Sequence, residues 1–414
     1  MYRSSLRSAA LLIAIIFHSI LYAFTGHAQD GTLHIPPTES IVIGVSIGLS
    51  GEGIAPLGVD IRRGVELGQE AFPTVTIEGV EFAIRLDVQD SQCNAEGGVA
   101  VANRFSSDPS IVGVIGPMCS SACLPASHIY DAAGYSFITP SCTAAVLSRR
   151  GSPSFNRVVS PDDVQGIHTA HYVVHTLGVR RAATLHDGSP YAEGLVDFFS
   201  ERFVAMGGEI VAADAVTVGD THFQALLSEI AATDPELIYF PGFPAEAARL
   251  IQQRFDVGLE ESIFFGGAAW KGPEVIELAG EAAEGTYAVG HVRRQGSEEL
   301  EARRAVFLQR YEERYGENPP QNYHFNGQAA YLMFHAAIAA VGRLDESGML
   351  LLHRDEIAAF LRSYQDATAL VGPIACDASG ECLTAATGVY RVEDGAFVLL
   401  DVILPEADET LPQG

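Results

Sequence analysis

A regular alternation of short apolar runs with longer segments of helical periodicity constrains the fold of this chain more than any other feature. In the segment 59–71, Ile61, Val65 and Leu67 stand among charged residues, which is the pattern of a half-buried helix. Apolar runs that alternate with such segments predict α/β layers with parallel sheets. In the first half of the chain the predicted strands are 41–49, 82–88, 111–115 and 136–139, and the predicted helices are 59–71, 98–106 and 124–133.

The same alternation begins again after residue 160 and predicts a second lobe. Its predicted strands are 181–185, 209–216, 237–240, 263–265 and 287–289, and its predicted helices are 164–177, 191–206, 223–232 and 245–257. Helices at 298–314, 322–341 and 354–364 follow, and the tail reads as a β-hairpin around Glu393-Asp394-Gly395. We therefore predict two doubly wound α/β lobes, which bind ligands in the crevice at the carboxyl ends of their strands.

The N-terminal segment has the organisation of a secretory signal peptide. Arg3 and Arg7 precede an apolar run at 9–24, and Gly26-His27-Ala28 offers a cleavage site of small residues. A membrane anchor is the alternative, but the apolar run is shorter than the roughly 20 residues that a span needs. We predict that residues 1–28 are removed and that the protein works in the periplasm.

Composition argues against several classes of protein. Asp and Glu outnumber Lys and Arg by 52 to 25, and the resulting net charge of −27 repels nucleic acid and anionic membranes. Six cysteines in an exported chain favour disulfides over a metal site. Cys119 and Cys123 lack the further histidine or cysteine pair that zinc requires. Cys376 and Cys382 flank a turn-like stretch that can close a small loop, and we predict no metal and no cofactor.

Two hydroxyl-rich turns, each of which follows a predicted strand, are the strongest indication of a binding site. Met118-Cys119-Ser120-Ser121 follows the strand at 111–115 and leads into a helix. The segment 139–143 offers the same chemistry at the end of the next strand. Backbone N–H groups at the start of a helix attract an anion. The serines alone are also suitable helix caps, but a cap does not need a second matching turn. We predict a site for a small carboxylate.

One motif points to an enzyme instead. Gly44-Val45-Ser46-Ile47-Gly48 matches the nucleophile pattern of α/β-hydrolases, which requires a sharp strand-to-helix turn at the serine. Here Ser46 lies inside an apolar run that continues to Leu49, so we predict a buried strand and no enzymatic activity.

Short segments along most of the chain carry a family resemblance. They include Asp87-Val88-Gln89-Asp90-Ser91-Gln92-Cys93, Gly116-Pro117-Met118-Cys119-Ser120-Ser121, Asp163-Val164-Gln165-Gly166 and Val371-Gly372-Pro373, with further pieces at 100–104, 186–195 and 279–285. In order and spacing they resemble the branched-chain amino-acid-binding receptors of bacterial ABC importers, the leucine/isoleucine/valine-type periplasmic proteins. The resemblance covers about 41–402.

The resemblance implies a type I periplasmic binding protein fold, with two α/β lobes joined by three crossings. Lobe 1 would take 41–160 and 292–370, and lobe 2 would take 161–291 and 371–404. Ligand binding would close the lobes, and the closed form would dock, as a monomer, on an ABC permease in the inner membrane. The resemblance also implies a disulfide between Cys93 and Cys119, which leaves Cys376 to pair with Cys382 and Cys123 with Cys142.

The resemblance further assigns roles within the two turns and the second lobe. Ser120 and Thr143 would hold the ligand carboxylate, the carbonyl of Ser141 would accept from its ammonium, and Tyr191 would cover the ligand. Met118 and Cys119 belong to the first of these turns and complete this part of the predicted site.

Three positions depart from the family pattern. Ala268 stands where the family has an ammonium-binding glutamate, Phe243 replaces a tyrosine, and Leu57 aligns near another tyrosine. Either another acid such as Asp162 takes over the ammonium, or the ligand carries none. We expect an apolar, branched-chain-like amino acid. The alternatives are a small organic acid or amide, such as an aromatic or keto acid, and a sensory ligand-binding module.

Overall fold

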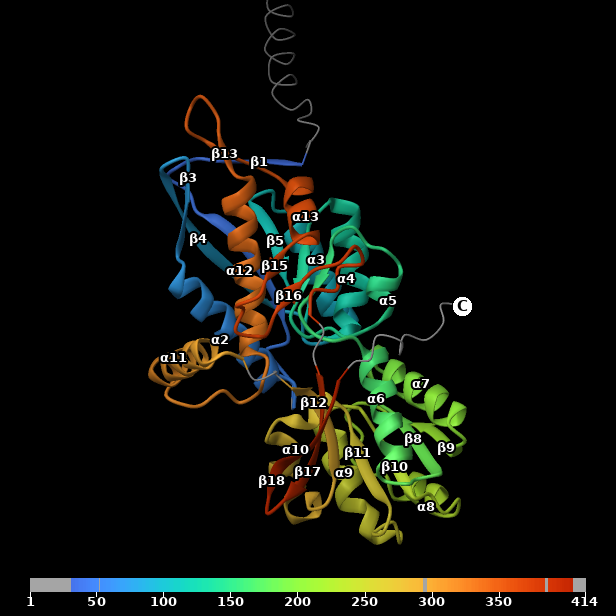
Figure 1. Cartoon of the computed structure of the whole chain (residues 1–414). Coiled ribbons are helices and arrows are strands. Elements are labelled where there is room, and N and C mark those ends of the chain that lie inside the picture. The colour runs from blue at the N-terminus through green and yellow to red at the C-terminus, as the bar shows by residue number, and fades with distance from the viewer. Residues whose placement is uncertain (1–30, 52, 293–295, 384–385, 405–414) are drawn as a thin grey trace, which may run out of the picture. The chain divides into compact units, whose positions relative to one another are not determined.

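Two mixed β-sheets with helices packed on their faces carry the fold (Figure 1). The computed structural model describes residues 31–51, 53–292, 296–383 and 386–404. The predicted signal peptide at 1–28 lies outside the described residues. In the described part of the chain, no helix has the length and apolar character needed to cross a bilayer.

The first sheet has six strands in the order β3-β4-β2-β5-β6-β7. Its strands are β2 (Ile41–Ile47), β3 (Thr74–Ile77), β4 (Val80–Asp90), β5 (Ile111–Ile115), β6 (Phe137–Thr139) and β7 (Phe155–Arg157). Every residue of β2 is buried, because helices cover both faces of a parallel sheet. The sequence of β2 is therefore apolar except for Ser46, which is also fully buried. This confirms the prediction that Ser46 lies in a buried strand and not in a nucleophile turn.

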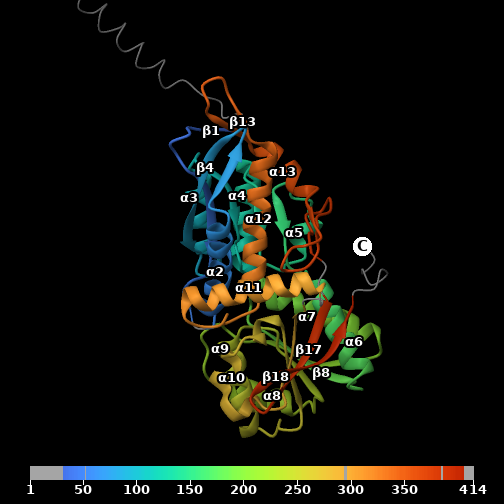
Figure 2. The same ribbon diagram turned by 60° about the vertical axis from the view of Figure 1, so that its left-hand side comes forward.

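Helices from two distant parts of the chain pack on this first sheet. The early helices are α2 (Ala55–Ala71), α3 (Ala95–Ser106), α4 (Ser120–Ala133) and the short α5 (Val146–Arg149), and the late ones are α11 (Glu298–Tyr315), α12 (His324–Val341) and α13 (Arg354–Arg362). Figure 2 shows α12 lying along the sheet with α11 across one end of it. Phe307 of α11 and Phe334 of α12 share one apolar core with Val45 of β2.

The second sheet has seven strands in the order β18-β17-β12-β11-β10-β8-β9. Its strands are β8 (Arg181–His186), β9 (Glu209–Ala215), β10 (Leu237–Tyr239), β11 (Ile263–Gly266), β12 (Tyr287–Val292), β17 (Ala386–Glu393) and β18 (Ala396–Ile403). Its helices are α6 (Asp162–His175), α7 (Pro190–Ala205), α8 (Gln224–Ala231), α9 (Pro244–Gln253) and α10 (Glu274–Ala279). The predicted tail hairpin is confirmed as β17 and β18, which pair antiparallel around Asp394-Gly395.

The expectation of parallel sheets is correct for most strand pairs, including the edge strands β7 and β9, but it fails at the opposite edge of each sheet. β3 pairs antiparallel with β4 at one edge of the first sheet, and β17 pairs antiparallel with β12 in the second. Neither β3 nor β7 is in the sequence-based prediction, because both are too short to show a clear period. Smaller strands form a three-stranded sheet, β1-β14-β13, and a two-stranded one, β15-β16. These are β1 (Thr32–Ile35), β13 (Arg343–Leu344), β14 (Leu350–His353), β15 (Gln365–Asp366) and β16 (Ile374–Ala375).

The packing of the late segments bears on where the lobes divide. Val371 and Leu383 both belong to the apolar core of the first sheet, whereas β17 belongs to the second sheet. We therefore propose that the second part of lobe 1 extends from 292 to Leu383 instead of ending at Leu370. The rest of the predicted division into lobes stays a proposal.

The cysteines form two of the three predicted pairs. Cys93 bonds to Cys119 with their Cα atoms 5.2 Å apart, and Cys376 bonds to Cys382 with their Cα atoms 3.7 Å apart. The pairing of Cys123 with Cys142 is wrong, because both are buried free thiols. Burial and the neighbouring thiol of Cys142 raise the pKa of Cys123 far above its ordinary value, which disfavours the thiolate that disulfide formation needs.

Candidate ligand-binding site

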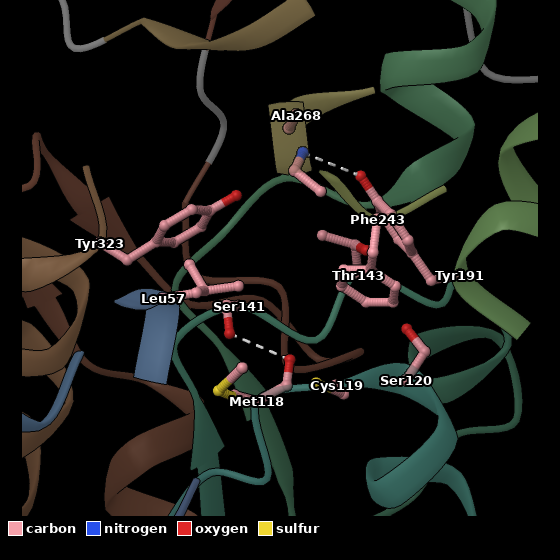
Figure 3. Close-up of a pocket in the computed structure, with 11 residues that line it drawn as sticks. Leu57, Met118, Cys119, Ser120, Ser141, Thr143, Tyr191, Phe243, Ala268 and Tyr323 are labelled. Atoms are coloured by element: carbon pink, nitrogen blue, oxygen red, sulfur yellow. Dashed lines mark hydrogen bonds between the residues drawn. The ribbon is translucent and has the colours of Figure 1, made fainter. Parts of the chain in front are cut away.

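A cavity of about 410 Å3, counted with its opening to solvent, lies where strands of both sheets end (Figure 3). It is lined by Leu57, Met118, Cys119, Ser120, Ser141, Thr143, Tyr191, Phe243, Ala268, Ala269 and Tyr323. The structure thus brings all eight residues of the predicted ligand site to one cavity.

The first turn, at 116–120, lies between β5 and α4. Gly116 has φ +104°, and a Cβ atom there would overlap the carbonyl oxygen of Ser46, so only glycine fits. Ser120 is the first residue of α4 and is 2% exposed. The first N–H groups of a helix have no partner within it and carry partial positive charge. This end of α4 is therefore suited to an anionic group.

The second turn, at 139–143, is organised around the side chain of Thr139. The Thr139 hydroxyl accepts from the N–H of Cys142 at 2.9 Å and donates to the carbonyl of Pro117 at 2.6 Å. The Ser141 hydroxyl donates to the carbonyl of Met118 at 3.0 Å, so the two turns are hydrogen-bonded to each other (Figure 3). As a result Ser120 and Thr143 present their hydroxyl groups to the same cavity.

Residues that follow strands of the second sheet form the opposite wall. Tyr191 lies in the first turn of α7, and its ring centroid is 5.7 Å from that of Phe243, which precedes α9. The Tyr191 hydroxyl accepts from the N–H of Ala269 at 3.3 Å (Figure 3). Burial raises the pKa of Tyr191 well above its ordinary value, so the hydroxyl stays neutral. This wall therefore offers a ligand an aromatic surface and one polar group, the Tyr191 hydroxyl.

Ala268, where the resemblance predicts a glutamate, is buried and hydrogen-bonded through its backbone. Ala268 is 5% exposed, and its N–H donates to the Gln165 side-chain oxygen at 2.9 Å. None of the eleven lining residues has a charged side chain. A ligand charge must therefore be met by hydroxyl groups, backbone groups or an acid next to the lining.

Asp162 is such an acid. It begins α6, is 1% exposed, and its N–H donates to the carbonyl of Thr143 at 3.0 Å. Burial raises the pKa of Asp162 to about 7, against the opposing effects of the Thr143 hydroxyl and the Arg157 guanidinium. Neither carboxylate oxygen has a hydrogen bond of good geometry within the described structure. A cation in the cavity would compensate this buried group.

Two lining residues, Ala269 and Tyr323, were missed by the sequence analysis, and only Tyr323 comes from a distant part of the chain. Its N–H donates to the Asp60 carboxylate at 2.7 Å, and the N–H of His324 donates to the same oxygen at 2.9 Å. Asp60 is fully buried in α2, and it fixes the start of α12 so that Tyr323 reaches the cavity. The sequence feature that could have indicated this contact is Asp60, an acidic residue within the predicted helix at 59–71.

Two α/β lobes that each contribute strand ends to one small cavity define a class of two-lobed ligand-binding proteins. Residues 40–396 match the periplasmic binding protein family, and the chain belongs to that family.

Relatives of known name are similar to long parts of the chain. A Leu/Ile/Val-binding protein homolog of Brucella melitensis is 25% identical over 362 residues, which are 87% of this chain and 94% of that protein. An amino acid binding protein of Pseudomonas aeruginosa is 35% identical over 176 residues, 42% of this chain. The chain spans about half the length of the Pseudomonas relative, 47%.

Solved structures are similar over most of the chain as well. The leucine binding protein LivK of Thermotoga maritima has a TM-score of 0.77 at 25% identity, over 88% of this chain and 99% of that chain. A solute binding protein of R. palustris in complex with benzoate has a TM-score of 0.74 at 22% identity, over 90% of this chain and 99% of that chain. The second likeness concerns the fold alone.

Proposed function

We propose that this protein is the periplasmic receptor of an ABC importer and that it binds an apolar, branched-chain-like amino acid between its lobes. The observation that carries the proposal is the convergence of Ser120, Ser141 and Thr143 with Tyr191 around one cavity. Relatives named for binding leucine, isoleucine and valine support the same ligand class. The ligand would be transferred to a permease in the inner membrane.

Ser120 and Thr143 donate hydrogen bonds to the ligand carboxylate in this proposal. Each hydrogen bond to a charged group contributes about 1.5–3 kcal/mol. The first turn of α4 adds its partial positive charge. The carbonyl of Ser141 accepts from the ammonium group, and Asp162 replaces the missing glutamate at Ala268 as its charge partner. The apolar side chain then lies against Leu57, Met118 and Phe243, which line the same cavity.

A second ligand class has its own supporting observation. No charged side chain lines the cavity, and an alanine, Ala268, stands where a glutamate was expected. An aromatic acid or a keto acid has no ammonium group, so it would need no acidic partner there. Phe243, Tyr191 and Tyr323 supply the aromatic surface that a benzoate-like ring would contact. A relative of the same fold was solved with benzoate.

The experiment that separates the two classes is a binding screen of the purified protein. L-leucine, the keto acid of leucine, leucinamide and benzoate are compared by thermal shift, followed by titration calorimetry. Binding of leucine but not of its keto acid supports the amino-acid proposal. Binding of the keto acid or benzoate without leucine supports the second class. Ester hydrolysis by the unmodified protein that is lost in a Ser46→Ala variant would contradict the receptor proposal.

A further inference from the structure

A small loop near the end of the chain contacts the strand that follows the carboxylate-binding turn. The Cys376–Cys382 disulfide closes this loop, and Glu381 lies within it. The N–H of Arg157 donates to the carbonyl of Gly380 at 2.8 Å, and the N–H of Cys382 donates to the carbonyl of Arg157 at 3.0 Å. The loop therefore extends the first sheet beyond β7, with Glu381 as the bridge partner of Arg157.

Gly380 makes this close approach possible. It has φ +90°, and a Cβ atom there would overlap the carbonyl oxygen of Phe155. The loop and β7 thus meet along their backbones, and only glycine fits at this point. A contact this close keeps Glu381 at a fixed place beside Arg157.

The Arg157 side chain connects this loop to the binding turn. Its guanidinium is fully buried and binds the Glu381 carboxylate with two N–H groups, one of them Nε at 3.0 Å from Oε2. Nη1 of the same guanidinium donates to the carbonyl of Cys142 at 3.3 Å and to that of Ala144 at 3.1 Å. These two carbonyls flank Thr143, which lines the cavity.

The hydrogen bond from Arg157 to the carbonyl of Cys142 also sets the direction of the N–H of Thr143. In a trans peptide, the carbonyl of one residue and the N–H of the next point in opposite directions. When Arg157 holds the carbonyl of Cys142, the N–H of Thr143 is directed away from Arg157. The carbonyl of Thr143 is held separately, by the N–H of Asp162. Among the described residues no hydrogen bond uses the Thr143 N–H, so it is available to a ligand.

We propose that Glu381 and Arg157 are a positioning pair for the ligand carboxylate. The disulfide-closed loop keeps Arg157 in place, and Arg157 keeps the turn at Thr143 in the shape that binds. This inference rests on the proposed carboxylate function of that turn. Removal of the Glu381 charge leaves the buried guanidinium without its hydrogen-bonded carboxylate, and we expect its hold on the two carbonyls to weaken.

The test compares Glu381→Gln with a matched control. Glu393→Gln makes the same change in an exposed ion pair, because Glu393 lies 3.6 Å from Arg391 in β17. The probe is L-leucine, measured by calorimetry well below the melting temperature, together with hydrogen exchange of the ligand-free protein. We expect Glu381→Gln to weaken leucine binding about tenfold or more and to speed amide exchange at 141–146, and Glu393→Gln to change neither.

A second variant keeps the test decisive if Glu381→Gln does not fold. Cys376→Ser combined with Cys382→Ser opens the loop but leaves Glu381 and Arg157 intact, and we expect a several-fold loss of affinity with faster exchange in the turn. An unchanged leucine affinity in the variant that folds overturns the proposal, and so does weaker binding without faster exchange at 141–146. A lower melting temperature alone, with unchanged affinity, assigns the pair a purely structural role and also overturns it.

The failure of this inference can be told apart from the failure of the proposed function. If the unmodified protein does not bind leucine, the amino-acid proposal fails, and the exchange measurement alone decides whether the pair orders the turn. If Ser120→Ala weakens binding while Glu381→Gln does not, the carboxylate site stands and only the positioning pair is wrong.

Discussion

The hydroxyl of Tyr191 accepts a hydrogen bond from the N–H of Ala269 at 3.3 Å, and this bond fixes the aromatic cover of the cavity against the turn that contains Ala268. The turn is fixed from its other side by Gln165, which accepts from the N–H of Ala268. The wall opposite the two hydroxyl-rich turns is therefore preorganised, and a ligand need not order it on binding.

Ser120 is the most direct test of the carboxylate site. We expect Ser120→Ala to weaken binding of the cognate ligand about 10- to 100-fold, because one hydrogen bond to a charged group contributes about 1.5–3 kcal/mol. Titration calorimetry gives the affinity. Ser121→Ala is the matched control, since the Ser121 hydroxyl donates to the carbonyl of Cys93 at 2.6 Å and does not line the cavity. Equal affinities of the Ser120→Ala variant and the unmodified protein would contradict the proposal that Ser120 binds the ligand carboxylate.

If Asp162 is the partner of the ligand ammonium, as proposed, leucine affinity will depend on pH. Burial raises the pKa of Asp162 to about 7 in the free protein, and a bound ammonium group lowers this pKa, so binding favours the deprotonated acid. Leucine affinity is therefore expected to be highest and constant above about pH 7. Below this pH we expect the affinity to fall by up to about tenfold per pH unit. Calorimetry between about pH 5 and 8 measures the slope.

The control for this pH dependence is Asp162→Asn. This variant retains the shape of the side chain but carries no charge, so we expect weaker leucine binding with no slope between about pH 5 and 8. A steep slope that persists in the variant would mean that another group is the ammonium partner.

Ala268 offers a gain-of-function test. Ala268→Glu restores an acid at the position of the missing glutamate, so we expect tighter binding of leucine and weaker binding of its keto acid or of benzoate. The added negative charge attracts the ammonium and repels a ligand that has only a carboxylate. Competition between leucine and benzoate, followed by thermal shift, shows the change in preference. Ala268→Gln is the uncharged control, and an equal effect of both variants would contradict a role for charge.

The state of the cysteines can be counted chemically. Cys123 and Cys142 are the two free thiols among the six cysteines of the chain, all of which the structure describes. We expect the denatured, unreduced protein to take up two alkyl groups, and the reduced protein to take up six. Mass spectrometry of the alkylated chain measures this directly. No uptake before reduction would show that Cys123 and Cys142 form a third disulfide.

Much of the site could be predicted because its residues are close together along the chain. Met118, Cys119 and Ser120 form one turn, and Ser141 and Thr143 form the next. Parallel strands end at one edge of a sheet, so adjacent strands place such turns side by side. Tyr191, Phe243 and Ala268 were added only by the family resemblance, since nothing local indicates that they face the first sheet.

Contacts between distant segments were out of reach of the sequence. Arg157 and Glu381 are separated by 224 positions, and Asp60 and Tyr323 by 263. Each residue by itself reads as an ordinary charged or aromatic residue. The two unpaired thiols are another case, because the sequence shows that cysteines are present but not whether two sulfur atoms bond.

The sequence by itself determined the alternation of strands and helices, the two lobes it predicts, and the hydroxyl turns, because periodicity and turn chemistry depend on near neighbours. Only the tertiary structure decided that Tyr323 lines the cavity, that Asp162 is buried beside Thr143, and that a late disulfide loop is connected to the turn at 139–143 through Arg157. The physical reason is that desolvation and long-range hydrogen bonds depend on which segments meet in space, and local patterns do not record this.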